Sequence, residues 1–211
     1  MDAVNPGYIS GFCMLVIGII GWMGLLDGLL SSLRMRPRTL FILLLTVYVM
    51  SGWHVPLGGT AVSVGGFALP LLCFLFLWAK LTQENRSYAF AAALLLGVTL
   101  FLLRYMLQLD PILHVTDEVY LIACAAALLP LLLSRYTALI LIIEGLGLCF
   151  MEVLSQLFLY PKGFVAMLGD FAFRDALILS VCAALLTHAF VYRCVDASAA
   201  LMRKVLVKRS R

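Results

Sequence analysis

Charged residues are scarce in this 211-residue sequence. Asp, Glu, Lys and Arg make up 12% of the residues, whereas an ordinary soluble domain contains roughly 25%. Hydrophobic residues make up 64%, and the mean hydropathy is +1.08. This composition excludes an ordinary soluble domain and predicts a protein that lies in a lipid bilayer.

The motifs of common enzymes and metal sites are also missing from the sequence. It contains no G-x-S-x-G, no H-E-x-x-H and no P-loop, which are patterns that place catalytic groups. The six cysteines show no paired metal spacing and are interpreted as small apolar packing residues: Cys13, Cys73, Cys124, Cys149, Cys182 and Cys194. We therefore expect no enzymatic activity, no cofactor, no metal and no nucleic-acid partner.

A basic leader is missing as well. No Lys or Arg precedes the first apolar run, and this run is too long for the core of a signal peptide. We expect the first apolar segment to be retained in the membrane.

Seven apolar segments are present, separated by short loops. A helix needs about 20 mostly apolar residues to cross a bilayer, because its backbone groups must be paired within the segment. The segments are approximately Ile9–Leu30, Leu40–Val55, Ala61–Ala79, Tyr88–Leu107, Val119–Leu133, Tyr136–Tyr160 and Ala176–Val195. The sequence predicts an all-α polytopic membrane bundle of about seven transmembrane helices.

The basic residues orient this bundle, because loops rich in Lys and Arg stay in the cytoplasm. Of the 15 basic residues, alternate loops hold all but Arg104, Lys162 and Arg174. The bias predicts an N-terminus outside and a C-terminus in the cytoplasm. Residues 1–196 would form one membrane domain, and 197–211 a basic tail that attracts anionic lipids.

The outer loop between the second and third segments is rich in helix breakers. "SGWHVPLGGTAVSVGGFALP" contains the pairs Gly58-Gly59 and Gly65-Gly66, and ends at Pro70. In one interpretation, Pro56 and the first pair make a tight turn, and the second pair lets another helix approach closely. In the other, the third segment is discontinuous and its open backbone groups line a polar cavity. Close packing predicts that Leu at Gly65 or Gly66 destabilises the bundle while Ala is nearly tolerated.

Two acidic residues lie inside the sixth segment. Glu144 and Glu152 are separated by about 80° around a helix, and Ser155 and Gln156 extend the polar stripe to about 120°. An ionisable group in hydrocarbon is costly unless it is paired or hydrated, so the stripe is expected to face the bundle interior. It forms either a proton or cation pathway or a structural hydrogen-bond network. In the first case, we expect a larger functional loss at Glu152 than at Glu144.

Arg104 and the acidic outer loops have simpler expected roles. Arg104 can extend to the membrane surface or pair with Asp110. Thr116, Asp117 or Glu118 can cap the fifth helix.

Two stretches of the chain resemble a known family. "SVGGFALPLLCFLFLW" and the later "MLGDFAFRDALILSVCAALL" are similar to membrane proteins of the YphA type in endospore-forming Gram-positive bacteria. The resemblance implies a plasma-membrane protein connected with sporulation or spore-envelope assembly, and it implies no catalytic residues. The expected function is therefore non-enzymatic envelope assembly, with membrane-protein partners or a second copy of the chain. The alternative is a small-solute or proton-coupled ion transporter.

Overall fold

The described chain is almost entirely helical. The computed structural model describes residues 7–24, 26–32, 35–57, 60–109, 117–159, 167–187 and 190. The predictions for Gly58-Gly59, Asp110 and the basic tail 197–211 concern residues outside these ranges. In chain order the elements are α1 (Tyr8–Trp22), α2 (Asp27–Ser32), α3 (Pro37–Val49), η1 (Met50–Gly52), β1 (His54–Leu57), β2 (Thr60–Ser63), η2 (Val64–Ala68), α4 (Leu69–Ala79), α5 (Gln83–Leu109), α6 (Glu118–Leu133), α7 (Thr137–Leu159) and β3 (Met167–Leu168). A further helix covers 171–187.

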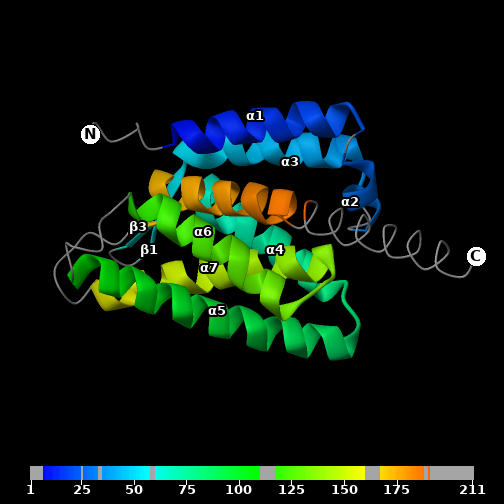
Figure 1. Ribbon diagram of the computed structural model, residues 1–211. Coiled ribbons are helices and arrows are strands. Elements are labelled where there is room, and N and C mark those ends of the chain that lie inside the picture. Colours follow the sequence, from blue (N-terminus) through cyan, green and yellow to red (C-terminus); the bar gives the residue numbers. More distant parts are fainter. Residues whose placement is uncertain are drawn as a thin grey trace, which may run out of the picture.

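Successive helices run alternately between two ends of the molecule (Figure 1). The strands β1 and β3 lie at one end, which we call the strand end, and α2 lies at the other, which we call the α2 end. The prediction of a mainly helical bundle is confirmed. Each of the seven predicted apolar segments overlaps at least one of these helices.

Two of the described helices are long and apolar enough to cross a bilayer by length and composition, α5 and α7. The apolar helices α1 and α6, and the helical stretches Pro37–Gly52 and Val64–Ala79, are shorter. The 15 residues of α1 extend about 22 Å, against a hydrocarbon core of about 30 Å. A crossing by all seven segments therefore stays a prediction.

Two of the predicted helical segments are interrupted. The first breaks into α1 and α2 at Gly24, whose φ of 77° lies in the left-handed region that commonly ends helices. The third begins as strand β2 and becomes helical only at Val64, through the π-helical turn η2.

The glycine-rich loop forms a small sheet instead of a simple turn. Strand β1 pairs antiparallel with β2, and β2 pairs parallel with β3. Pro56 lies inside β1 opposite Ala61, so the prediction that it makes the turn is wrong. Pro70 lies in the first turn of α4, directly after η2.

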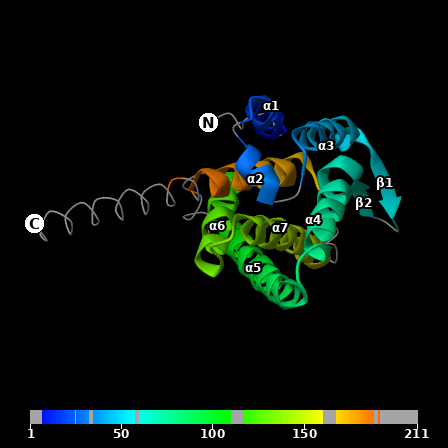
Figure 2. The same ribbon diagram turned by 90° about the vertical axis from the view of Figure 1, so that its right-hand side faces the viewer.

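Helix α7 lies in the centre of the bundle. Figure 2, viewed nearly along the helices, shows α7 enclosed by α4, α5, α6 and the helix 171–187, with α1 and α3 beyond the latter. Among the labelled elements its most extensive contact is with α5, which buries a stripe of four small residues and two leucines: Ala89, Ala92, Ala93, Gly97, Leu96 and Leu100. A polar group on the inner side of α7 must therefore find its partners within the protein.

Gly65 and Gly66 lie where backbone segments touch. A Cβ atom at Gly65 would collide with the carbonyl oxygen of Val47 and with the amide nitrogen of Ser51. A Cβ atom at Gly66 would collide with the carbonyl oxygen of Gly169. The expectation that alanine is nearly tolerated here is therefore wrong, because these obstacles are main-chain atoms that cannot rotate away.

Candidate functional site

The polar stripe of α7 faces the interior of the bundle. The exposed fractions of Glu144, Glu152 and Ser155 are 0%, 1% and 3%, and Gln156 is half-buried. Such positions need internal partners, since hydrocarbon and packed apolar side chains offer none. Whether these residues serve a function beyond packing stays a prediction.

Glu152 belongs to an ion-pair cluster that joins three helices. Arg104 of α5 donates a hydrogen bond from Nη1 to Glu152 Oε2 of α7 at 2.9 Å. Arg104 Nε also lies 2.6 Å from Oε1 of Glu118 in the first turn of α6. One guanidinium thus serves two carboxylates, and a planar fork of donors suits this arrangement better than a point charge.

The second oxygen of Glu152 connects the cluster to the segment before the last described helix. Oε1 accepts from Gln156 Nε2 at 3.2 Å and from the backbone N–H of Gly169 at 3.4 Å. Gln156 donates a further bond to the carbonyl of Met167 at 3.1 Å. Both oxygens of Glu152 therefore have partners, and they tie α7 to β3.

The cluster also reaches the glycine-rich break. The carbonyl oxygen of Gly169 packs closely against Gly66, and the backbone N–H of Gly169 donates a hydrogen bond to Glu152. The space between Gly66, Gly169 and their neighbours Ser63 and Asp170 is too narrow to hold a water molecule. The acid stripe and the glycine break thus meet through a packed backbone contact in the described part of the chain.

Ser155 does not extend the polar path. Its hydroxyl donates to the carbonyl of Met151 at 2.8 Å, one turn earlier on α7. Such back-bonding satisfies the hydroxyl within its own helix. Among the described residues, the polar connection therefore continues through Gln156 and through the direct bond from Gly169 to Glu152.

Glu144 differs from Glu152 in having no basic partner among the described residues. Within that part of the chain, neither carboxyl oxygen has a hydrogen bond. The carboxyl group faces Ser180 of the helix 171–187, but the Ser180 hydroxyl donates to the carbonyl of Leu177 at 2.9 Å. Glu144 is therefore a buried carboxyl group without a basic or hydrogen-bonding partner among the described residues.

A second polar cluster fixes the start of α1. Asp175 accepts from the backbone N–H groups of Gly7 at 2.7 Å and Ser10 at 2.8 Å, which are unpaired donors at a helix N-terminus. The neighbouring Arg174 donates to Ser10 Oγ at 2.8 Å and to the carbonyl of Gly7 at 3.2 Å. A carboxylate from the far end of the sequence thus caps the first helix.

The partners of Glu152 were not predicted from the sequence. Arg104 was expected to reach the surface or Asp110, and Glu118 was expected to cap a helix. The sequence did contain a signal for this pair. Arg104 is the only basic residue within the predicted fourth segment, and both Arg104 and Glu152 of the sixth segment are expected near the same end of the bundle. No group of three His, Cys, Asp or Glu side chains within the described ranges could hold a metal ion.

The fold and this cluster define a helical membrane bundle whose interior is joined by buried polar contacts. A family model described as YphA-like integral membrane protein matches residues 10–209, so the chain belongs to this family of integral membrane proteins. The predicted resemblance is confirmed. No curated protein and no solved structure matches the chain.

Proposed function

We propose that this chain is a multi-pass protein of the bacterial cell membrane that acts in envelope assembly by binding other components, without catalysis. The observation that carries the proposal is the use of its internal polar groups: Arg104 joins α5, α6 and α7, and Asp175 joins the last described helix to α1. These contacts make a stable framework. The YphA-type resemblance supports a role in sporulation or in assembly of the spore envelope.

The proposed topology has seven crossings, with the N-terminus outside. It is supported by the alternation of the helices between the two ends (Figure 1). Among the described residues, Arg36, Arg38, Lys80, Arg86 and Arg135 begin or follow helices at the α2 end. At the strand end, the basic residues of the described ranges are Arg104 and Arg174, and both are bound in the polar clusters. The α2 end is therefore proposed to face the cytoplasm.

Cysteine labelling tests this topology. In a variant that lacks the native cysteines, Val55→Cys on β1 should react with a membrane-impermeant maleimide added to intact cells. Arg38→Cys at the start of α3 should react only after the membrane is permeabilised. Both side chains are exposed in the structure, so shielding by the protein does not explain a difference. Reaction of Arg38→Cys in intact cells would refute the orientation.

Proton-coupled transport is the second candidate function, and Glu144 favours it. A buried carboxyl group that has no hydrogen bond among the described residues can carry a proton between two states of a transporter. Glu152 is less suitable for this role, because Arg104 neutralises its charge. If the protein is a transporter, we therefore expect the larger functional loss on substitution of Glu144, in place of the larger loss at Glu152 that the sequence predicts.

Complementation of a deletion strain separates the two functions. If the protein is an assembly factor, we expect Glu144→Gln to restore sporulation to the wild-type level, because the amide keeps the shape of the side chain. Glu118→Gln, which removes a half-buried acid at the edge of the ion-pair cluster, is the matched control. Loss of sporulation in Glu144→Gln alone, with unchanged thermal stability in detergent, would exclude the assembly role and support proton coupling. A deletion strain that sporulates normally would overturn the link to sporulation.

A further inference from the structure

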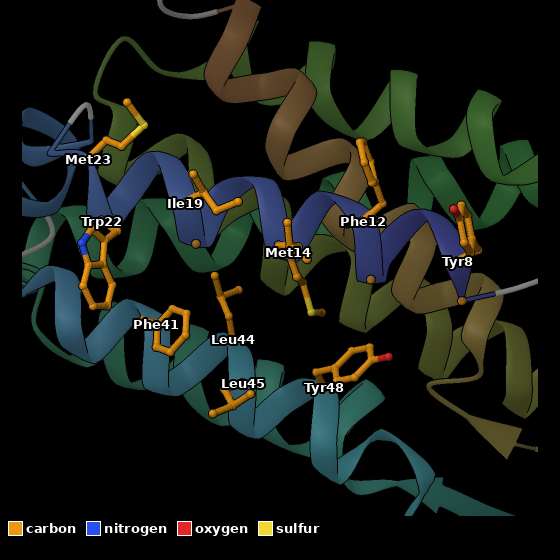
Figure 3. Close-up of a pocket in the computed structure, with 14 residues that line it drawn as sticks. Tyr8, Phe12, Met14, Ile19, Trp22, Met23, Phe41, Leu44, Leu45 and Tyr48 are labelled. Carbon is orange, nitrogen blue, oxygen red and sulfur yellow. The ribbon is translucent and has the colours of Figure 1, made fainter.

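An apolar groove of about 740 Å³ lies between α1 and α3, and at one end it reaches Gly7 of the second polar cluster. Figure 3 shows Met14 of α1 and Leu44 of α3 pointing into the space between the two helices. Trp22 and Phe41 lie together at one end, with ring centroids 6.2 Å apart, and Tyr48 lies toward the other end. The groove is open to the surroundings of the protein along part of its length, as the exposure of Trp22 (81%) and Leu45 (52%) shows.

Glycines shape the α1 side of the groove. Gly11 and Gly18 lie along it, and Cβ atoms at these positions would lie 3.4 Å from the ring of Tyr48 and 3.5 Å from the ring of Phe41. The two aromatic rings therefore approach the backbone of α1 at two points. The rings of Tyr48 and Phe41 therefore take up the space that side chains at Gly11 and Gly18 would fill.

The groove is long enough to hold a lipid chain. Its lining on α1 extends from Gly7 to Met23, a distance of about 24 Å along a helix. The hydrocarbon core is about 30 Å thick, so the acyl chains of one leaflet extend about 15 Å. One acyl chain can thus lie within the groove and occupy part of its length.

A basic side chain continues the groove at the Trp22 end. The residues Phe41, Leu45 and Tyr48 line it from α3. Arg38 lies three, seven and ten residues before them, which places it on the same face of the helix, one turn beyond the groove. Its side chain is exposed, so it can meet a negative group at the mouth of an otherwise apolar site.

We propose that this groove binds one anionic phospholipid, with an acyl chain between α1 and α3 and the phosphate group at Arg38. The complementary charge at one end and the apolar lining favour a lipid over a protein segment. The proposal requires only that the protein lies in a membrane. Its test is therefore independent of the proposed assembly role and of the orientation of the bundle.

Native mass spectrometry of the full-length protein in detergent tests the proposal. Phosphatidylglycerol and phosphatidylcholine with identical acyl chains are added separately. We expect one phosphatidylglycerol to be retained with about fivefold higher affinity, since one basic residue near a membrane surface contributes about 1 kcal/mol. Arg38→Gln should abolish this preference. Lys80→Gln removes an equal charge at the α2 end away from the groove and should preserve it.

A second pair of variants tests the apolar part. Leu45→Trp fills the groove and should weaken the binding of both lipids, whereas Ile42→Trp places the same ring on an exposed part of α3 outside it. Equal affinities for the two lipids in the wild type would overturn the proposal, as would identical binding by the two Trp variants. A dimer that Leu45→Trp dissociates would show instead that a second copy covers the groove. Arg38→Gln changes an exposed residue, so its result stands even if a Trp variant fails to fold.

Discussion

Replacing Arg104 with methionine is expected to lower the free energy of unfolding by about 3–5 kcal/mol, because it leaves a buried carboxylate without its counter-charge. Glu152 is 1% exposed and receives its charged hydrogen bond from Arg104. The effect should be measured by denaturant or thermal unfolding of the protein in detergent.

Two further variants show that the effect belongs to the pair. The double variant Arg104→Met with Glu152→Gln should be more stable than Arg104→Met alone, because the amide carries no charge and its oxygen still accepts from Gly169. Glu118→Gln should cost at most about 1 kcal/mol, since that side chain is 25% exposed and partly screened. An Arg104→Met variant no less stable than Glu118→Gln would contradict the assigned role of the pair.

Gly66→Ala is expected to destabilise the protein by about 1–3 kcal/mol or more, as overpacking of a close contact does. The new methyl group would meet the carbonyl oxygen of Gly169. Gly169 has a φ of 76°, a conformation that favours glycine, so this turn cannot move easily to make room. Gly66→Leu should be worse, and Gly65→Ala should behave similarly because it meets the backbone of α3 and η1. Unfolding in detergent measures all three.

Gly52→Ala is the matched control for these variants. It lies in the neighbouring turn η1, and a Cβ atom there would meet nothing within 4 Å, so we expect a change of stability within about 0.5 kcal/mol. The effect of Gly66→Ala should also be non-additive with that of Glu152→Gln, because Gly169 contacts both sites. A fully stable Gly66→Ala variant would show that the close contact between η2 and Gly169 does not support the fold.

Much of the helical framework was predictable because the helical structure of an apolar segment depends on that segment alone. The backbone of an apolar segment in a membrane must satisfy its hydrogen bonds internally. The interruptions were less predictable. The strand β2 occupies the first residues of a segment that appeared helical, because its hydrogen-bond partners come from β1 and, more than 100 residues later, from β3.

The candidate site was predictable on one side only. The spacing of Glu144, Glu152 and Gln156 places them on one face of a helix, and this periodicity is visible in the sequence. Their different surroundings are not visible there. Glu152 meets Arg104, 48 residues away in the chain, while Glu144 meets Ser180 and apolar neighbours. Two equivalent acids of one stripe thus have different chemistry because other helices supply their partners.

The same limit applies to the two ends of the chain. Asp175 could be recognised from its sequence as a residue near a helix start, and it does lie in the first turns of the helix 171–187. Its carboxylate nevertheless caps α1, 165 residues away. Local capping rules predict the residue type, and the packing of the last described helix against α1 selects which N–H groups it serves.

Apolar composition by itself determined that this protein is a helical membrane protein, because transfer to a bilayer depends on the apolar content of each segment and not on its neighbours. Tertiary structure alone decided which acid is neutralised, where the glycines touch the backbone and where α1 and α3 leave a groove. Those features depend on distances between residues that are remote in the chain. A hydrogen bond or a collision is decided within less than an ångström, and only the packed arrangement of helices sets distances at that scale.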